Sequence, residues 1–150
     1  LVANKWDLSG GEIATEAYAK YLSDRMPGMI YAPVVFTTAR DSRNTQTAID
    51  LAQSLYKRAS GRAGTGELNR VMKAILEHRP PPAKKSRMAK IYYATQVAVC
   101  PPVFVVFVNE PKAFPNDYRR YLANALREAL HFEEIPIQVL FRRRESLYHD

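Results

Sequence analysis

The placement of glycine divides this chain into two parts. All six glycines lie at or before Gly66, and three of them fall in the tract 60–66. A run of small, flexible residues between patterned segments is typical of a linker. We therefore expect two folding units, at residues 1–60 and 67–150, joined by a glycine-rich linker at 61–66.

Residues 1–60 have the pattern of an α/β fragment. Short apolar segments at 1–3 and 32–38 predict strands, and the segments after them predict amphipathic helices over 12–25 and Thr45–Ala59. A strand–helix–strand–helix order is typical of a parallel sheet. Two strands are few for such a sheet, so we expect part of a larger domain, whose exposed strand edges favour self-association or poor order. The stripe of the second helix that should face the sheet consists of Ala48, Ile49, Ala52, Leu55 and Tyr56.

Residues 67–150 have the pattern of an α+β domain with the order α-β-β-α-β. The apolar run Val103–Val108, bounded by prolines, predicts a central strand, and alternation over 90–99 predicts a half-buried strand beside it. A three-stranded sheet with both helices on one face satisfies these patterns. The remaining elements are a helix from Thr65 to the prolines at 80–82, a helix over 116–130 and a last strand over 137–141.

The formal charge of +7 belongs mainly to the second unit. Residues 1–64 carry +2 and residues 65–150 carry +5. A basic unit indicates a polyanionic partner such as nucleic acid or an anionic membrane surface. No apolar stretch approaches the roughly 20 residues that span a bilayer, and no secretory signal opens the chain, so we expect a cytoplasmic protein with no membrane partner. A single cysteine, Cys100, makes no internal disulfide, and the three histidines lack ligand spacing, so we expect no metal site.

The strongest motif is the Asn-Lys-Trp-Asp box at 4–7, which follows the first strand. Guanine presents two N–H donors on one edge and two acceptors, O6 and N7, beside them. A carboxylate accepts from both donors, a carboxamide contacts N7, and a backbone N–H serves O6. The tip of the next parallel strand, where α/β folds bind ligands, supplies that N–H, and a lysine stem lies over the base. The predicted guanine-binding residues are Asn4, Lys5, Asp7, Thr38 and Ala39.

Several further segments form a combination that is specific to one protein family. The most specific are KIYYATQV at 90–97 and PPVFVVFVN at 101–109. The others are NKWDL at 4–8, ELNRVM at 67–72, HRPPP at 78–82, YRRYLANALRE at 118–128 and IPI at 135–137. In these segments, which cover nearly the whole chain, the sequence resembles the bacterial tandem-GTPase family called EngA or Der.

The resemblance implies both a fold and a function. Members have two consecutive GTPase domains and then a KH-like domain, bind GTP or GDP with Mg²⁺, and act in assembly of the large ribosomal subunit. Residues 1–60 then form the end of the second GTPase domain of a P-loop fold, and residues 67–150 form the KH-like domain. The implied partners are the large ribosomal subunit, ribosomal RNA and the protein's own GTPase domains. Thr38-Ala39 stands where the family has Ser-Ala, a small departure because a backbone N–H makes the contact.

The sequence lacks the catalytic parts of a GTPase. Phosphoryl transfer depends on a phosphate loop, a threonine switch and Mg²⁺. The glycines of 61–66 have the phosphate-loop spacing, but Glu67 and Leu68 follow where Lys and Ser/Thr are needed. We therefore expect no catalytic residue in this chain, no GTP hydrolysis by the chain alone, and no firmly bound cofactor.

RNA contact by the second unit requires chemistry other than that of a standard KH module, which clamps the backbone with a GxxG loop between two of its helices. GRAG at 61–64 matches that pattern but belongs to the linker. Arg119 and Arg120 open a helix, where the dipole disfavours cations, and so hint at an anionic partner. Tyr92 is suited to stack a base or pack on a neighbouring domain. The candidate RNA or ribosome contacts are Lys84, Lys85, Arg87, Lys90, Tyr92, Arg142, Arg143 and Arg144.

Two functions fit these observations. In the first, the KH-like domain contacts ribosomal RNA or protein and couples that contact to the nucleotide state. In the alternative, it is an intramolecular interaction module, whose exposed sheet face docks on a GTPase domain without binding RNA. The strand face that carries Tyr92, Ala94 and Ala98 is apolar enough for the alternative, while the charge of +5 favours the first.

Overall fold

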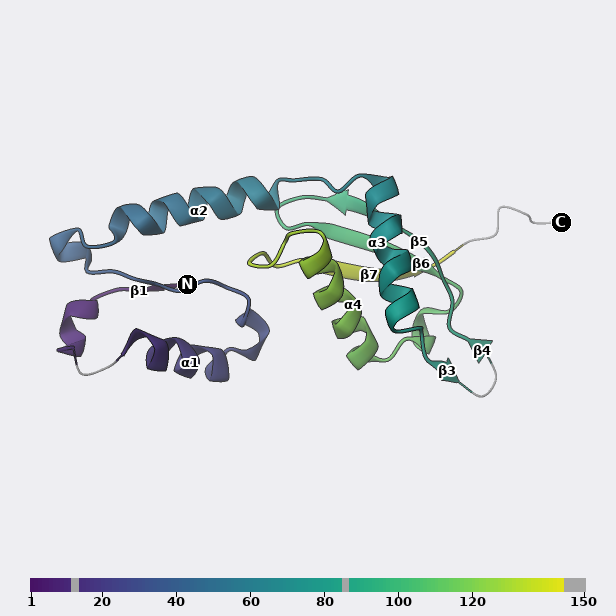
Figure 1. Ribbon diagram of the computed structural model, residues 1–150, viewed down its shortest axis with the longest axis horizontal. Coiled ribbons are helices and arrows are strands. Elements are labelled where there is room, and N and C mark those ends of the chain that lie inside the picture. Colours follow the sequence, from purple (N-terminus) through teal and green to yellow (C-terminus); the bar gives the residue numbers. More distant parts are fainter. Residues whose placement is uncertain (12–13, 85–86, 145–150) are drawn as a thin grey trace. The chain divides into compact units, whose positions relative to one another are not determined.

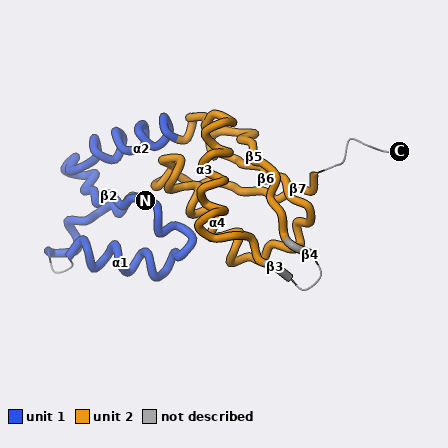
Figure 2. Tube along the Cα trace, turned by 45° about the vertical axis from the view of Figure 1, so that its right-hand side comes forward, with its two compact units in different colours: residues 1–58 blue, residues 59–150 orange. Residues whose placement is uncertain are grey.

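The computed structural model describes residues 1–11, 14–84 and 87–144, with only the backbone described at 83–84 and 87–88. The chain divides into two compact units, Leu1–Arg58 and Ala59–Asp150, drawn in blue and orange in Figure 2. Each unit has its own sheet.

The first unit contains one pair of short parallel strands. Strand β1 (Val2–Ala3) pairs with β2 (Val35–Phe36), with Val2 opposite Val35 and Ala3 opposite Phe36. Helix α1 (Thr15–Arg25) lies between the strands in sequence, and α2 (Thr45–Ala59) follows the second strand. The predicted parallel pairing is confirmed. That these elements are part of a GTPase domain stays a prediction at this point.

The apolar stripe of α2 is not buried as predicted. None of the residues of α2 is buried, and Ile49 and Tyr56 are 52% and 70% exposed. The reason is geometric, because two strands of two residues each offer too little surface to cover a helix of 15 residues. Helical spacing therefore predicted the helix correctly, but it did not predict whether another element covers its apolar stripe.

The second unit is a three-stranded mixed sheet covered by two helices (Figure 1). Strand β6 (Val103–Val108) is central, antiparallel to β5 (Ile91–Ala98) and parallel to β7 (Gln138–Arg143). The predicted central strand is therefore confirmed. An antiparallel pair of β3 (Ala83–Lys84) and β4 (Arg87–Met88) precedes β5 and was not predicted.

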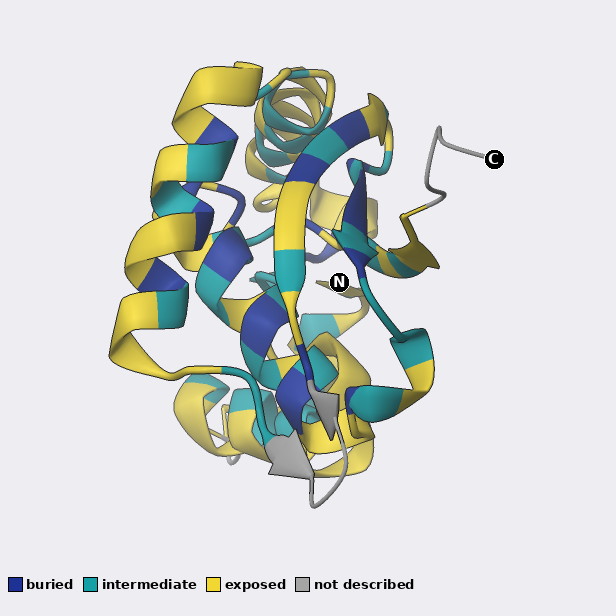
Figure 3. Ribbon diagram, turned by 90° about the vertical axis from the view of Figure 1, so that its right-hand side faces the viewer, coloured by how far each residue is buried: buried dark blue, intermediate teal, exposed yellow. Residues whose placement is uncertain are grey.

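Helices α3 (Thr65–His78) and α4 (Asn116–Ala129) lie on the same face of this sheet, as predicted (Figures 1 and 3). Phe104 and Val106 point from β6 into the layer between sheet and helices, and both are fully buried. Their partners from the helices include Leu68, Leu122 and Leu126, each with no exposed surface. Burial of one such side chain contributes about 1.5–3 kcal/mol, so this layer holds the second unit together.

Asn69 protects the free edge of the sheet. Strand β5 has a neighbour on one side only, so its outer backbone groups need other partners. The Asn69 side chain accepts from the N–H of Ala94 at 2.9 Å and donates to the carbonyl of Ala94 at 3.0 Å. One side chain from α3 thus takes the place of a neighbouring strand at the centre of β5.

The end of α3 is tied to α4 through Tyr118. Its hydroxyl donates to the carbonyl of Arg79 at 3.0 Å, and the Arg79 guanidinium lies 4.7 Å from the ring of Tyr121. Burial, then the nearby Tyr121, raises the pKa of Tyr118 to about 12. The hydroxyl therefore stays protonated, and available as a donor, throughout the ordinary pH range.

Candidate functional site

The two predicted recognition segments of the first unit meet in space. Because β1 and β2 are parallel neighbours, the residues after each strand emerge at the same edge. The Oδ1 atom of Asn4 accepts from the backbone N–H of Ala39 and from the hydroxyl of Thr37, each at 3.1 Å. The structure therefore brings together Asn4 and Ala39, which are 35 residues apart in sequence.

The backbone of the box is held against the second strand. Trp6 N–H donates to the carbonyl of Thr37 at 3.0 Å, and Lys5 adopts a left-handed conformation with φ of 60°. Thr37 and Thr38 are both 4% exposed, whereas the side chain of Lys5 is exposed. The turn at Lys5 thus leaves the lysine stem at the surface beside the strand tips.

An aromatic cluster that sequence reasoning missed supports this turn. The Trp6 ring lies 4.3 Å from that of Phe36 and 5.3 Å from that of Tyr18, measured between centroids. Phe36 belongs to β2 and Tyr18 to α1, so the cluster connects the box to both elements. Trp6, the aromatic residue inside the box, was the sequence signal from which such a cluster could have been predicted.

Among the described residues, Asp7 has one cationic neighbour. A terminal nitrogen of Arg40 lies 3.8 Å from the Asp7 carboxylate, while Arg40 Nε donates to Asp41 at 2.9 Å. The hydrogen bond to Asp41, and then the charge of Asp7, raise the pKa of Arg40 above its usual value. The Arg40 side chain is 78% exposed, so its attraction for Asp7 is weak and leaves the carboxylate available to N–H donors.

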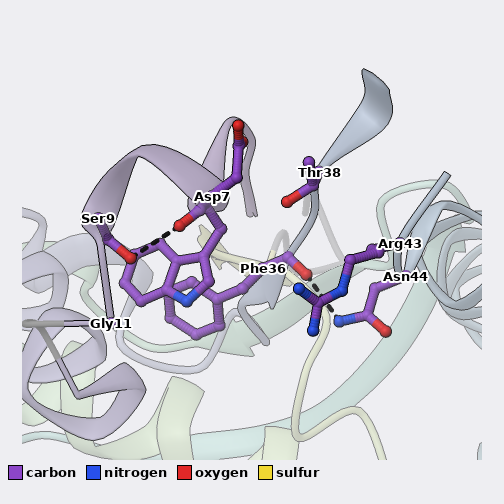
Figure 4. A pocket seen from close by; sticks show the side chains of 8 residues that line it. Asp7, Ser9, Gly11, Phe36, Thr38, Arg43 and Asn44 are labelled. Carbon is purple, nitrogen blue, oxygen red and sulfur yellow. Dashed lines mark hydrogen bonds between the residues drawn. The ribbon is translucent and has the colours of Figure 1, made fainter. Parts of the chain in front are cut away.

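A pocket of about 320 Å³ adjoins the box, at the low end of the range for ligand sites (Figure 4). Of the predicted guanine-binding residues, Asp7 and Thr38 line it, whereas Asn4, Lys5 and Ala39 do not. Asn44, which was not predicted, lines it and donates to the carbonyl of Phe36 at 2.9 Å. The other lining residues are Trp6, Ser9, Gly11, Phe36 and Arg43.

In the second unit, the structure gathers three of the predicted RNA-contact residues. The Lys90 ammonium lies 5.3 Å from the centre of the Tyr92 ring, and the Arg144 guanidinium lies 5.1 Å from it. Arg142 and Arg143 are exposed on the last strand. Lys85 lies outside the described residues. For Lys84 and Arg87, only the backbone, in β3 and β4, is described.

A β-bulge explains the exposure of Tyr92. Ile91 pairs with Val108 and Tyr93 with Phe107, so Tyr92 is an extra residue on β5. The bulge breaks the alternation, and Tyr92 and Tyr93 are 39% and 42% exposed although they are adjacent.

The expectation that Tyr92, Ala94 and Ala98 form one exposed face is therefore wrong. Ala94 is fully buried, and Gln96, on the same side, is 9% exposed. That side of β5 is covered because α3 packs on it.

Arg119, one of the two arginines that hint at an anionic partner, has partners inside the unit, whereas Arg120 is exposed. Arg119 Nε donates to the carbonyl of Phe114 at 2.9 Å, and a terminal nitrogen donates to the carbonyl of Pro111. Its guanidinium lies 4.6 Å from the centre of the Phe141 ring. The Arg119 guanidinium is thus in contact with two carbonyl oxygens and the face of one aromatic ring, all within the second unit.

The GRAG segment is held by the same unit. Gln96 Oε1 accepts from the N–H of Ala63 at 2.7 Å, and Gln96 Nε2 donates to the carbonyl of Gly61 at 3.1 Å. One N–H and one carbonyl of the GRAG segment are thus engaged with β5.

Within the described residues, no group of three or more His, Cys, Asp or Glu side chains is placed to hold a metal ion. The same part of the chain contains no helix with the length and apolar character needed to cross a membrane.

Comparisons with known proteins show which family the sequence matches. Residues 62–142 match the family described as the KH-domain-like C-terminal domain of EngA bacterial GTPase enzymes. A relative named GTPase Der from Rhodopirellula baltica is 43% identical over 143 residues, covering 95% of this chain and 32% of the relative. Proteins of the same name from Natranaerobius thermophilus and Thermomicrobium roseum are 38% and 39% identical, covering 97% and 95% of the chain. The chain spans about a third of the length of these relatives.

Proposed function

Because the chain belongs to the EngA family of bacterial GTPases, we propose that its first unit recognises guanine and its KH-like unit contacts the large ribosomal subunit. The parent activity is GTP hydrolysis in a cytoplasmic factor for large-subunit assembly. Residues 1–60 are assigned to the end of the second GTPase domain, 61–66 to the linker and 67–150 to the KH-like domain.

The observation that carries the guanine assignment is the 3.1 Å bond between Asn4 and the N–H of Ala39, across the tips of two parallel strands. This bond consumes the Asn4 oxygen, so the amide nitrogen is left to donate to guanine N7. The Ala39 N–H then makes a bifurcated hydrogen bond, in which it donates both to Asn4 Oδ1 and to guanine O6. Asp7 accepts from N1 and N2, and the Lys5 stem lies over the base.

The chain supplies base specificity rather than phosphoryl transfer. Transfer of the γ-phosphoryl group needs a phosphate cradle, Mg²⁺ and a positioned water. Asn4, Asp7 and Ala39 meet the base edge and provide none of these. In the full-length protein, GTP or GDP with Mg²⁺ is the ligand, and this chain alone binds the base weakly and hydrolyses nothing.

Contact with ribosomal RNA is supported by the basic residues around Tyr92. Lys90, Arg142, Arg143 and Arg144 have no carboxylate within 4.0 Å in the described part of the chain. Uncompensated cations on one unit attract a polyanion.

The alternative function, docking on the protein's own GTPase domains without direct RNA binding, is favoured by a different observation. Val97 and Leu140 leave 51% and 42% of their surface exposed on the sheet. Exposed apolar side chains of this kind suit a protein partner.

Replacing Asp7 with Asn tests the guanine assignment. The variant loses the acceptor for guanine N1 and N2, and its amide N–H suits the carbonyl at C2 of xanthine. We expect guanosine affinity to fall about tenfold or more and xanthosine affinity to rise. The readout is the chemical shift of the Ala39 amide, titrated with each nucleoside at millimolar concentration.

Asp41→Asn is the matched control, because Asp41 pairs with Arg40 and is assigned no contact with the base. It should leave the preference for guanosine unchanged. Equal shifts with adenosine and guanosine in the natural chain, or an unchanged preference in Asp7→Asn, would show that the assignment is wrong.

A further inference from the structure

The sheet face opposite α3 and α4 combines exposed rings with cations. The register places Tyr93, Phe107 and Arg142 in one row across β5, β6 and β7. Tyr93 stacks on Phe107 with centroids 4.6 Å apart and planes 20° apart, and 42% of Tyr93 remains exposed. The row therefore carries an exposed aromatic ring on one outer strand and an arginine on the other.

A pair of cations lies at the end of the sheet next to this row. Lys90 and Arg144 are 54 residues apart, but backbone hydrogen bonds hold both at the same end of β6. Arg144 N–H donates to the carbonyl of Val108 at 2.9 Å, and Asn109 N–H donates to the carbonyl of Lys90 at 3.1 Å. Both charges then lie about 5 Å from the centre of the Tyr92 ring. The Tyr92 ring is in contact with two cations, so the exposed ring that is available to stack a base is that of Tyr93.

We propose that this open sheet face binds single-stranded RNA, with a phosphodiester between Lys90 and Arg144 and an adjacent base stacked on Tyr93. The inference rests on the proposed contact with ribosomal RNA and deepens it, since it names the surface and the form of RNA. A single strand is required because only an unpaired base can stack on a side chain. The site differs from a KH cleft in using the sheet and no glycine loop.

The choice of RNA over an acidic protein segment follows from combining the two features. A carboxylate-rich peptide pairs with the cations, but its carboxylate side chains have no flat ring that stacks on Tyr93. A nucleotide satisfies both, because its phosphate and base are neighbours on one chain.

The test uses the 150-residue chain and a fluorescein-labelled 12-nucleotide oligouridine, with binding followed by anisotropy between 50 and 200 mM salt. Lys90→Ala with Arg144→Ala should weaken binding about 10- to 100-fold. It should also reduce the slope of log affinity against log salt by about 0.7, because the two cations hold one phosphate and each phosphate contact contributes about 0.7 for a single strand. Tyr93→Leu retains apolar packing on Phe107 but removes the stacking face. It should weaken binding about fivefold or more with an unchanged salt slope.

Arg70→Ala with Arg120→Ala is the matched control, since it removes two exposed charges from α3 and α4, which lie on the opposite face of the sheet. The inference is wrong if this control weakens binding as much as the Lys90 and Arg144 pair. It is also wrong if oligoglutamate of equal charge competes as well as unlabelled RNA, or if inorganic phosphate does so at equal charge. RNA binding that survives all the sheet variants overturns this surface but leaves the proposed ribosomal RNA contact standing. No binding at 50 mM salt overturns both.

Discussion

Replacing Arg119 with Met is expected to lower the free energy of unfolding of the KH-like unit by about 3 kcal/mol, a drop in melting temperature of roughly 10–20 °C. Arg119 donates to the carbonyls of Phe114 and Pro111 and lies against Phe141. Met retains an apolar stem against the ring but donates to neither carbonyl. The loss is large because hydrogen bonds from a charged donor are the strong ones.

Urea unfolding followed by circular dichroism measures this loss. Trp6 is the single tryptophan of the chain and belongs to the first unit. The urea midpoint of its fluorescence transition should therefore be the same in the variant and in the natural chain. The matched control is Arg120→Met, because Arg120 is exposed and adjacent, and it should stay within about 0.5 kcal/mol of the natural chain. If Arg119→Met leaves stability intact and instead weakens RNA binding, then Arg119 faces a partner after all.

Replacing Gln96 with Leu should cost about 2–4 kcal/mol of stability in the same unit. The Gln96 amide satisfies the N–H of Ala63 and the carbonyls of Gly61 and Ala98, at distances of 2.7 to 3.1 Å. Leu fills a similar volume but leaves these backbone groups without their partner. A buried polar group that loses its partner is destabilising beyond the value of the bond itself.

Hydrogen exchange at the Ala63 amide gives a local readout of this attachment. The amide should be protected in the natural chain and should exchange much faster in Gln96→Leu. Gln138→Leu is the control, since Gln138 is exposed on β7 and should change neither quantity. Rapid exchange of Ala63 in the natural chain would mean that the GRAG segment is free, and a clamp on nucleic acid would regain support.

Elements with a strong local pattern were predictable from the sequence. The uninterrupted apolar run of β6 indicated a strand covered on both sides by neighbours, and it is central. Helical spacing in α3 and α4 identified the residues that form the core. The parallel pair β1 and β2 followed from alternation of short strands with helices.

Features that depend on contacts between distant residues were not predictable. Strict alternation placed Tyr92 beside Ala94, because a single extra residue in β5 is visible only once its partner strand is in register. The partners of Arg119 are carbonyls, and every residue has one, so no sequence signal marked them. The two-residue strands β3 and β4 are too short to produce a period.

The candidate guanine site shows the same division. The types and order of Asn4, Asp7 and Ala39 indicated the chemistry, and the parallel strands explained why they meet. The supports of the site, namely the ring cluster around Trp6 and the Asn44 bond to Phe36, are three-dimensional and emerged only from the fold.

A division of labour between the two units is the central claim, and amide chemical shifts of the isotope-labelled chain test it most directly. Guanosine should shift amides near residues 4–7 and 37–44, and adenosine should not. Oligouridine should shift amides of β5, β6 and β7 around Tyr93, Phe107 and Arg142. Guanosine shifts that adenosine reproduces, or RNA shifts centred on 61–64 rather than on the sheet, would contradict the claim.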